Sequence, residues 1–113
     1  MSGAGAEAER LVHRHFILRG YRVLASNAWA GGRELDIIAR RGRRLVFCEV
    51  KMRRTAAFGL PAEAVGHEKA RRVVRGAEAW LAQHPELAGL EVSLEVAAVH
   101  GRRIEQMSRV LES

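Results

Sequence analysis

The sequence has little of several features that mark other classes of protein. Its 113 residues include one cysteine, so no internal disulfide can form, and two prolines, and aromatic residues make up 5% of the chain. No window approaches the ~18 uncharged apolar residues of a membrane-spanning helix, and charged residues interrupt the first twenty positions, where a secretory signal is apolar. These absences predict a cytoplasmic protein of one domain, residues 1–113, with no membrane association.

Positive charge is in excess, and arginine supplies nearly all of it. The chain has 19 Lys and Arg against 13 Asp and Glu, a formal net charge of +6. In a small domain this excess favours an anionic partner, and nucleic acid is the first candidate. Two of the basic residues, Lys51 and Lys69, are lysines. Either a lysine survives there by chance, or the position requires an ammonium group rather than positive charge alone.

The spacing of apolar residues predicts two helices and five strands. The expected helices cover residues 8–16, ended by Gly20, and residues from about 61 to 83, ended by His84 and Pro85; the expected strands are residues 21–25, 34–40, 44–52, 92–98 and 102–107. The stretch that follows residue 25, through Ala30, Gly31 and Gly32, is expected to be a loop, and Gly42 the turn of an antiparallel hairpin. The order α-β-β-β-α-β-β predicts an α/β fold, a mixed β-sheet flanked by helices.

Three ionisable residues interrupt the two apolar strands of this hairpin. Asp36 lies in the first strand, and Glu49 and Lys51 lie two apart in the second, on one face of the sheet. Charged groups in such strands cost free energy unless they are paired or bind a metal. The turn at Gly42 brings Asp36 near Glu49, and two carboxylates suit a hard cation such as Mg²⁺ or Mn²⁺. Lys51 would lie beside the ion, where it can orient a water and offset charge on a phosphate.

The segments around these three residues carry a resemblance to known proteins. They are GYRVLASN at 20–27, ELDIIAR at 34–40, LVFCEVKMRR at 45–54 and FGLPAEAV at 58–65. Together they resemble the YraN-like family of small bacterial proteins, and the spacing of Asp36, Glu49 and Lys51 resembles that of the PD-(D/E)XK nucleases. The resemblance, which extends more distantly to the archaeal Holliday junction resolvases, implies a restriction-endonuclease-like fold. It also implies that Asp36 and Glu49 bind the metal with the Val50 carbonyl and Glu9 of the first helix, and that Lys51 is catalytic.

The sequence departs from the family pattern at three positions. Arg33 stands where a glycine usually precedes Glu34, Ala8 stands where a glycine usually precedes Glu9, and Glu95 replaces an aspartate of the late strand. Glu34 either reaches the site or is solvated, and the role of Glu95 stays open. Trp80, on the apolar stripe of the second helix, is expected in the core, and Cys48 is expected to be a small buried apolar residue.

Basic residues follow the strand that carries Lys51 and recur on the second helix. They are Arg53, Arg54, Lys69, Arg71, Arg72 and Arg75. These residues either contact phosphates or form a solvated helix face. The sequence therefore predicts a Mg²⁺- or Mn²⁺-dependent endonuclease that acts on nucleic acid, DNA in the first place, and that can work as a homodimer. Three alternatives stay open: a non-catalytic nucleic-acid-binding protein with this fold, a protein-interaction module, and a structural ion-pair cluster in place of the metal site.

Overall fold

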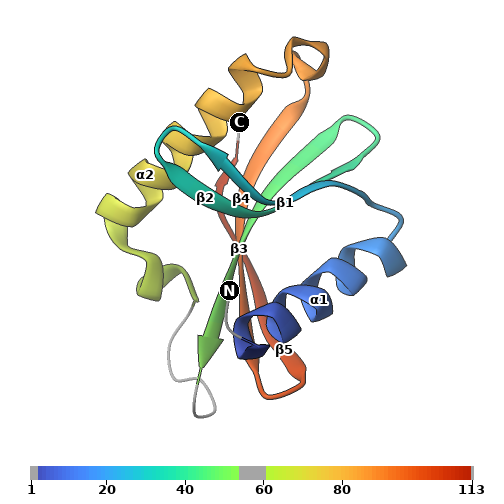
Figure 1. The fold of residues 1–113 in the computed structure, drawn as a ribbon, viewed down its shortest axis with the longest axis vertical. Coiled ribbons are helices and arrows are strands. Elements are labelled where there is room, and N and C mark those ends of the chain that lie inside the picture. The colour runs from blue at the N-terminus through green and yellow to red at the C-terminus, as the bar shows by residue number, and fades with distance from the viewer. Residues whose placement is uncertain (1–2, 54–60, 113) are drawn as a thin grey trace.

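A five-stranded mixed sheet forms the centre of the molecule, and a helix packs on each of its faces (Figure 1). The computed structural model describes residues 3–53 and 61–112, and the side chains of residues 5–52 and 70–111. The elements are α1 (Gly3–Leu18), β1 (Arg22–Ala30), β2 (Arg33–Arg41), β3 (Arg44–Arg53), α2 (Pro61–Ala82), a 3-10 turn (Pro85–Leu87), β4 (Glu91–His100) and β5 (Arg103–Glu112). The predicted α-β-β-β-α-β-β order is confirmed.

The strands lie side by side in sequence order, from β1 to β5. β3 and β4 are parallel, and α2 makes the crossover that a parallel pair requires. The other neighbours are antiparallel. The predicted hairpin is confirmed: β2 and β3 pair from Arg41 and Arg44 at the turn, where Gly42 has a φ of 60°. This left-handed φ is the conformation that glycine adopts without steric cost.

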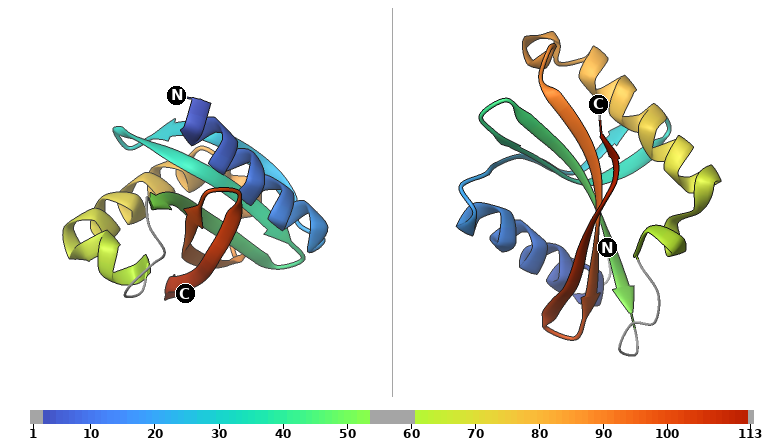
Figure 2. Two further views of the ribbon diagram at one scale, coloured as in Figure 1. Left: turned by 90° about the horizontal axis from the view of Figure 1, so that it is seen from below. Right: turned by 180° about the vertical axis from the view of Figure 1, so that it is seen from behind.

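Each face of the sheet buries a separate hydrophobic cluster, because the two helices lie on opposite sides of the sheet (Figure 2). The cluster under α1 includes Val12, Phe16, Ile37, Val46 and Cys48, and the cluster under α2 includes Leu35, Ile38, Phe47, Val73 and Trp80. Trp80 packs edge-on against Phe47, which confirms its expected place in the core. Cys48 is fully buried, as expected, and burial raises the pKa of its thiol.

The five strands are all longer than the apolar pattern predicts, β1 and β5 by the most. β1 continues through Ser26 and Asn27 to Ala30, so the expected loop is wrong and the turn shrinks to two glycines, Gly31 and Gly32. Ser26 and Asn27 interrupt the alternation of apolar residues by which a strand is predicted from sequence, so the second half of β1 was not predicted. β5 extends to Glu112 because an edge strand tolerates polar residues toward its end. Neither described helix has the length and apolar character needed to cross a bilayer.

β2 and β3 stop pairing at one end, and side chains bridge the two strands there. The ladder ends where Ile37 faces Cys48. Beyond it, the Val50 N–H donates to Asp36 Oδ2 at 2.9 Å, and the Asp36 N–H donates to Glu49 Oε2 at 3.5 Å. The sheet thus opens into a fork at Asp36, and we call this region the β2–β3 fork.

Candidate functional site

Three carboxylates from two elements meet at the β2–β3 fork. Glu9 comes from α1, and Glu34 and Asp36 come from β2, where a spacing of two places them on one face. One carboxylate oxygen from each lies within 4.8 Å of the other two. We call these residues the acidic cluster. The structure therefore brings Asp36 together with Glu9, and it adds Glu34, whose role the sequence left open.

The electrostatics of Glu9 reflect this crowding. Burial raises the pKa of Glu9 above its ordinary value of 4.5, and the negative charges of Asp36 and Glu34 raise it further, against a hydrogen bond to Asn27 that lowers it. The folded protein therefore holds this proton more tightly than the unfolded chain. Ionisation of Glu9 consequently removes stability as the pH rises from 4.5 through the raised value. A cation in the acidic cluster would offset the same repulsion.

Glu49 lies at the fork but is paired with an arginine. Its Oε1 accepts a hydrogen bond from Arg33 Nη2 at 2.8 Å, and the two side chains are 9% and 23% exposed. The stem of Arg33 lies against α2, since a Cβ placed on Gly76 would come within 3.1 Å of Arg33 Cγ. Arg33 is one of the three residues at which the sequence departs from the family pattern. The Arg33 guanidinium is thus hydrogen-bonded to the Glu49 carboxylate. Glu49 lies beside the backbone of Asp36 but outside the acidic cluster.

β3 places Val50 and Lys51 at the same end of the fork. Val50 lines a pocket of about 240 Å³ together with Gly5, Glu9, Asp36 and Met52. Because the N–H and C=O of a strand residue point to the same neighbouring strand, the Val50 carbonyl lies on the side of Asp36. Lys51 is partly buried, two residues beyond Glu49. The resemblance implies that the Val50 carbonyl is a metal ligand and that Lys51 is catalytic. Val50 lies beside Asp36, and Lys51 is the next residue of β3, whose side chain projects from the opposite face of the strand.

The basic residues of α2 lie beside the hairpin that carries the acidic cluster. Arg71, Arg72 and Arg75 are exposed on α2. A Cβ on Gly31, in the β1–β2 turn, would come within 3.0 Å of the Arg75 carbonyl oxygen, so turn and helix are in direct contact. Arg54 and the side chains of Arg53 and Lys69 lie outside the described residues. The described arginines form what we call the basic face of α2.

Glu95, whose role the sequence left open, belongs to a separate ion pair. It is buried on β4, and its Oε2 lies 3.4 Å from Arg109 Nε on β5. The Ser93 hydroxyl donates to the same oxygen at 3.5 Å. This pairing satisfies the buried carboxylate without a metal, so Glu95 has a structural contact that joins two neighbouring strands.

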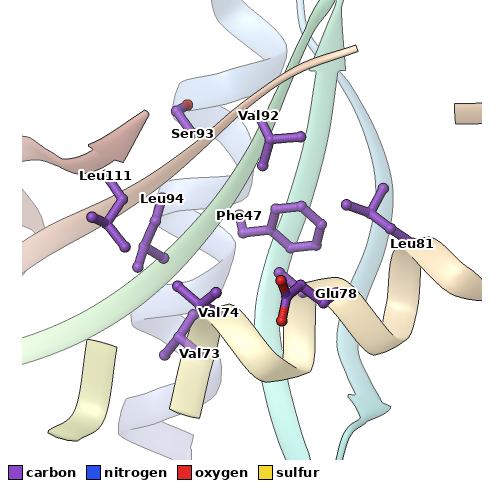
Figure 3. Close-up of a pocket in the computed structure, with 10 residues that line it drawn as sticks. Phe47, Val73, Val74, Glu78, Leu81, Val92, Ser93, Leu94 and Leu111 are labelled. Atoms are coloured by element: carbon purple, nitrogen blue, oxygen red, sulfur yellow. The ribbon is translucent and has the colours of Figure 1, made fainter. Parts of the chain in front are cut away.

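A pocket of about 320 Å³ between α2 and the sheet has a different character (Figure 3). Phe47, Val73, Leu81 and Leu94 contribute apolar side chains to it, and Glu78 is the one carboxylate among its lining residues. Hard cations bind to several oxygen ligands, so this pocket does not suit one. Among the described residues, the acidic cluster at the β2–β3 fork suits a hard cation better than this pocket does.

Sequence reasoning missed Trp29. Its side chain is 68% exposed, and it lies directly opposite Glu34 in the β1–β2 register. The available signal was a tryptophan followed by a turn of glycines, but it fell in a stretch expected to be loop. A strand assignment would have placed the indole on the solvent side of an edge strand, next to a carboxylate.

Comparison with known proteins gives one consistent result. Residues 8–109 match the family described as "Uncharacterised protein family UPF0102". A protein named UPF0102 protein from Methylorubrum extorquens is 44% identical over 101 residues, which cover 89% of this chain and 77% of the relative. Proteins of the same name from Saccharophagus degradans and Beutenbergia cavernae are 37% and 44% identical, covering 89% and 84% of this chain and 86% and 80% of those relatives.

Proposed function

The chain belongs to the UPF0102 family, and we propose that it is a metal-dependent phosphodiester hydrolase of the restriction-endonuclease-like class that acts on DNA. One observation carries the proposal: the acidic cluster of Glu9, Glu34 and Asp36 forms where β2 and β3 separate. The neighbouring strand β3 carries a further carboxylate, Glu49, beside the backbone of Asp36, and Lys51 two residues beyond it. A purely structural cluster would not require like charges to gather there.

The donor set fits Mg²⁺ or Mn²⁺. Carboxylate and carbonyl oxygens are the ligands these hard cations prefer, and Asp36, Glu9, Glu34 and the Val50 carbonyl supply them. A bound cation would polarise the phosphate and lower the pKa of a water at the site. Glu49 would join these ligands only by exchanging its hydrogen bond with Arg33. These donors fit the cation. The repulsion among the carboxylates, which contributes to the raised pKa of Glu9, would be relieved when the cation binds.

Lys51 supplies the remaining chemistry in this proposal. Its ammonium group, partly buried at the end of β3, would donate to the attacking water and balance the charge that grows on the phosphate. The basic face of α2 would hold the flanking phosphates, because the β1–β2 turn brings this helix against the hairpin that carries the acidic cluster. In this proposal α2 binds the phosphates, and the neighbouring β2–β3 fork carries out the hydrolysis.

Two substitutions of Asp36 test the metal site. Asp36→Asn keeps an oxygen that can accept the Val50 N–H, so the metal-free protein should be as stable as wild type or more stable. It should also lose the rise in melting temperature that Mg²⁺ or Mn²⁺ gives wild type. Asp36→Ala removes the acceptor and should cost about 1–3 kcal/mol. Thermal melts in EDTA and in metal measure both effects, and a full metal shift in Asp36→Asn would contradict the site.

A double substitution tests the basic face. Arg71→Ala with Arg72→Ala should weaken binding to DNA and flatten the dependence of log affinity on log salt concentration, because fewer counterions are released from phosphates. Arg14→Ala with Arg22→Ala is the matched control, since it removes equal charge from exposed arginines on α1 and β1. The control should keep the wild-type slope. Equal slopes in both double variants would rule out the basic face as the phosphate-binding surface.

A non-catalytic nucleic-acid-binding protein is the second candidate. The Arg33–Glu49 pair favours it, because this contact satisfies a buried carboxylate without a metal. Assays of the purified protein on branched, single-stranded and duplex DNA with Mg²⁺ or Mn²⁺ separate the two functions. Metal-dependent cleavage supports the hydrolase, whereas salt-dependent binding with no cleavage and no metal shift supports the binding protein.

A further inference from the structure

Exposed large apolar side chains border the acidic cluster. Among the described residues, five large apolar side chains are exposed: Ile17, Leu18, Trp29, Met52 and Leu111. Two of these five border the site. Met52, 47% exposed on β3, lines the pocket that contains Glu9 and Asp36, and Trp29 lies on the other side of the fork. Single exposed apolar residues are common on protein surfaces, but this pairing of apolar and acidic groups is local to the fork.

The register of β1 and β2 places the Trp29 indole beside the acidic cluster. Trp29 and Glu34 are directly opposite, so their side chains project from the same face of the hairpin with Cβ atoms about 5 Å apart. Ala30, the next residue, is buried in the cluster under α2, which confirms that Trp29 faces away from that core. A flat aromatic surface therefore stands next to the carboxylates, 68% exposed.

The same hairpin connects Trp29 to the basic face of α2. Gly31, two residues beyond Trp29, lies against the backbone of Arg75. The hairpin thus carries an exposed indole next to the carboxylates and, at its turn, contacts the helix that bears the arginines; a nucleotide could stack its base on the indole while its phosphates contact cations. A paired base inside a duplex has both faces covered by its neighbours, so away from duplex ends the indole can stack only on an unpaired base.

We propose that Trp29 is a stacking platform for an unpaired base, and that the substrate is single-stranded DNA or DNA with an unpaired nucleotide next to the cleaved bond. This inference rests on the proposed function and names its substrate class. The base would lie on Trp29 with its phosphate directed toward the acidic cluster. Met52 would contact the nucleotide from the opposite side of the fork.

Binding in EDTA tests the stacking separately from metal and cleavage. The probe is labelled oligothymidylate, and the comparison is a blunt duplex of equal length. Trp29→Ala should lower affinity for the single strand about tenfold, and Trp29→Phe should retain most of it, because any aromatic ring can stack. Leu18→Ala is the matched control, since Leu18 is 71% exposed at the other end of α1. The control should bind as wild type does.

Fluorescence provides a second measurement. In a Trp80→Phe background Trp29 is the sole tryptophan, and oligothymidylate should quench its emission, whereas an abasic oligomer with the same phosphates should not. Wild-type affinity in Trp29→Ala, or equal losses on the single strand, the duplex and the abasic oligomer, would overturn the proposal. So would a Trp29→Ala variant that loses self-association in sedimentation while it keeps its affinity, because the indole would then be a protein interface.

The two proposals fail in different ways. If the metal shift and cleavage are absent but Trp29 still distinguishes single strands from duplex, the hydrolase is wrong and the stacking platform stands. If Asp36→Asn removes the metal shift but Trp29→Ala binds single strands normally, the hydrolase stands and the substrate class is wrong.

Discussion

Arg33→Met is expected to lower the free energy of unfolding of the metal-free protein by about 3–5 kcal/mol, because it leaves a buried charge without its partner. The Glu49 side chain is 9% exposed, and the Arg33 guanidinium donates to it at 2.8 Å. Methionine keeps the apolar stem that packs against Gly76, so the change removes the charge more than the packing. Urea unfolding in EDTA measures the loss.

The same variant should gain more stability from Mn²⁺ than wild type does. In wild type a cation must displace Arg33 before it can use Glu49, whereas Arg33→Met removes this competitor. Arg109→Met is the matched control, because Arg109 pairs with Glu95 away from the acidic cluster and its side chain is 43% exposed. The control should leave the Mn²⁺ shift unchanged. An Arg33→Met variant with wild-type stability and a wild-type Mn²⁺ shift would remove Glu49 from the metal site.

The Arg33–Glu49 pair offsets the negative charge of Glu49 beside Asp36. Two ionised carboxylates at close range repel, and a guanidinium on one of them removes much of that repulsion. Arg33 therefore acts as a counter-ion built into β2, and it would compete with a bound cation for Glu49. A glycine at this position, as the family pattern has, would leave Glu49 without this partner.

Much of the fold could be predicted because local signals agreed with each other. Apolar runs on both sides of Gly42 specified the β2–β3 hairpin, and a helical stripe ending before Pro85 specified α2. The end of β1 could not be predicted in this way. Asn27 adopts a left-handed φ of 53°, a conformation that is typical of turns, yet the pairing of β1 with β2 continues on both sides of it. Tertiary pairing overrode the local preference there.

The candidate site was predictable in part. A spacing of two between Glu49 and Lys51 and a turn at Gly42 were enough to bring Asp36 near Glu49. The partner of Glu49 was not predictable, because Arg33 reaches it only where the β2–β3 ladder ends. In a regular sheet Leu35 and Ile37 would share one face, but Leu35 packs under α2 and Ile37 under α1. This change of face directs Asp36 toward Glu9 rather than toward the Glu49 carboxylate.

Lys51→Arg is expected to lose most cleavage, about 10²-fold or more, the scale of a misplaced catalytic group. The substitution keeps the positive charge and introduces arginine, the residue that the chain has at nearly all of its other basic positions. If Lys51 only balances Glu49 or covers a strand end, arginine should serve equally well. Glu49 already has a guanidinium partner in Arg33, so a second one would add nothing to that contact.

A catalytic role for Lys51 requires a compact ammonium group. A planar guanidinium on a longer stem would displace the water or tilt it away from in-line attack on the phosphate. Affinity for DNA should change little, because the charge is kept, and both quantities are to be measured on one preparation of the protein. A low cleavage rate with wild-type affinity therefore assigns Lys51 to the chemical step. Wild-type cleavage by Lys51→Arg would make this lysine structural, and the proposed hydrolysis would then rest on the acidic cluster alone.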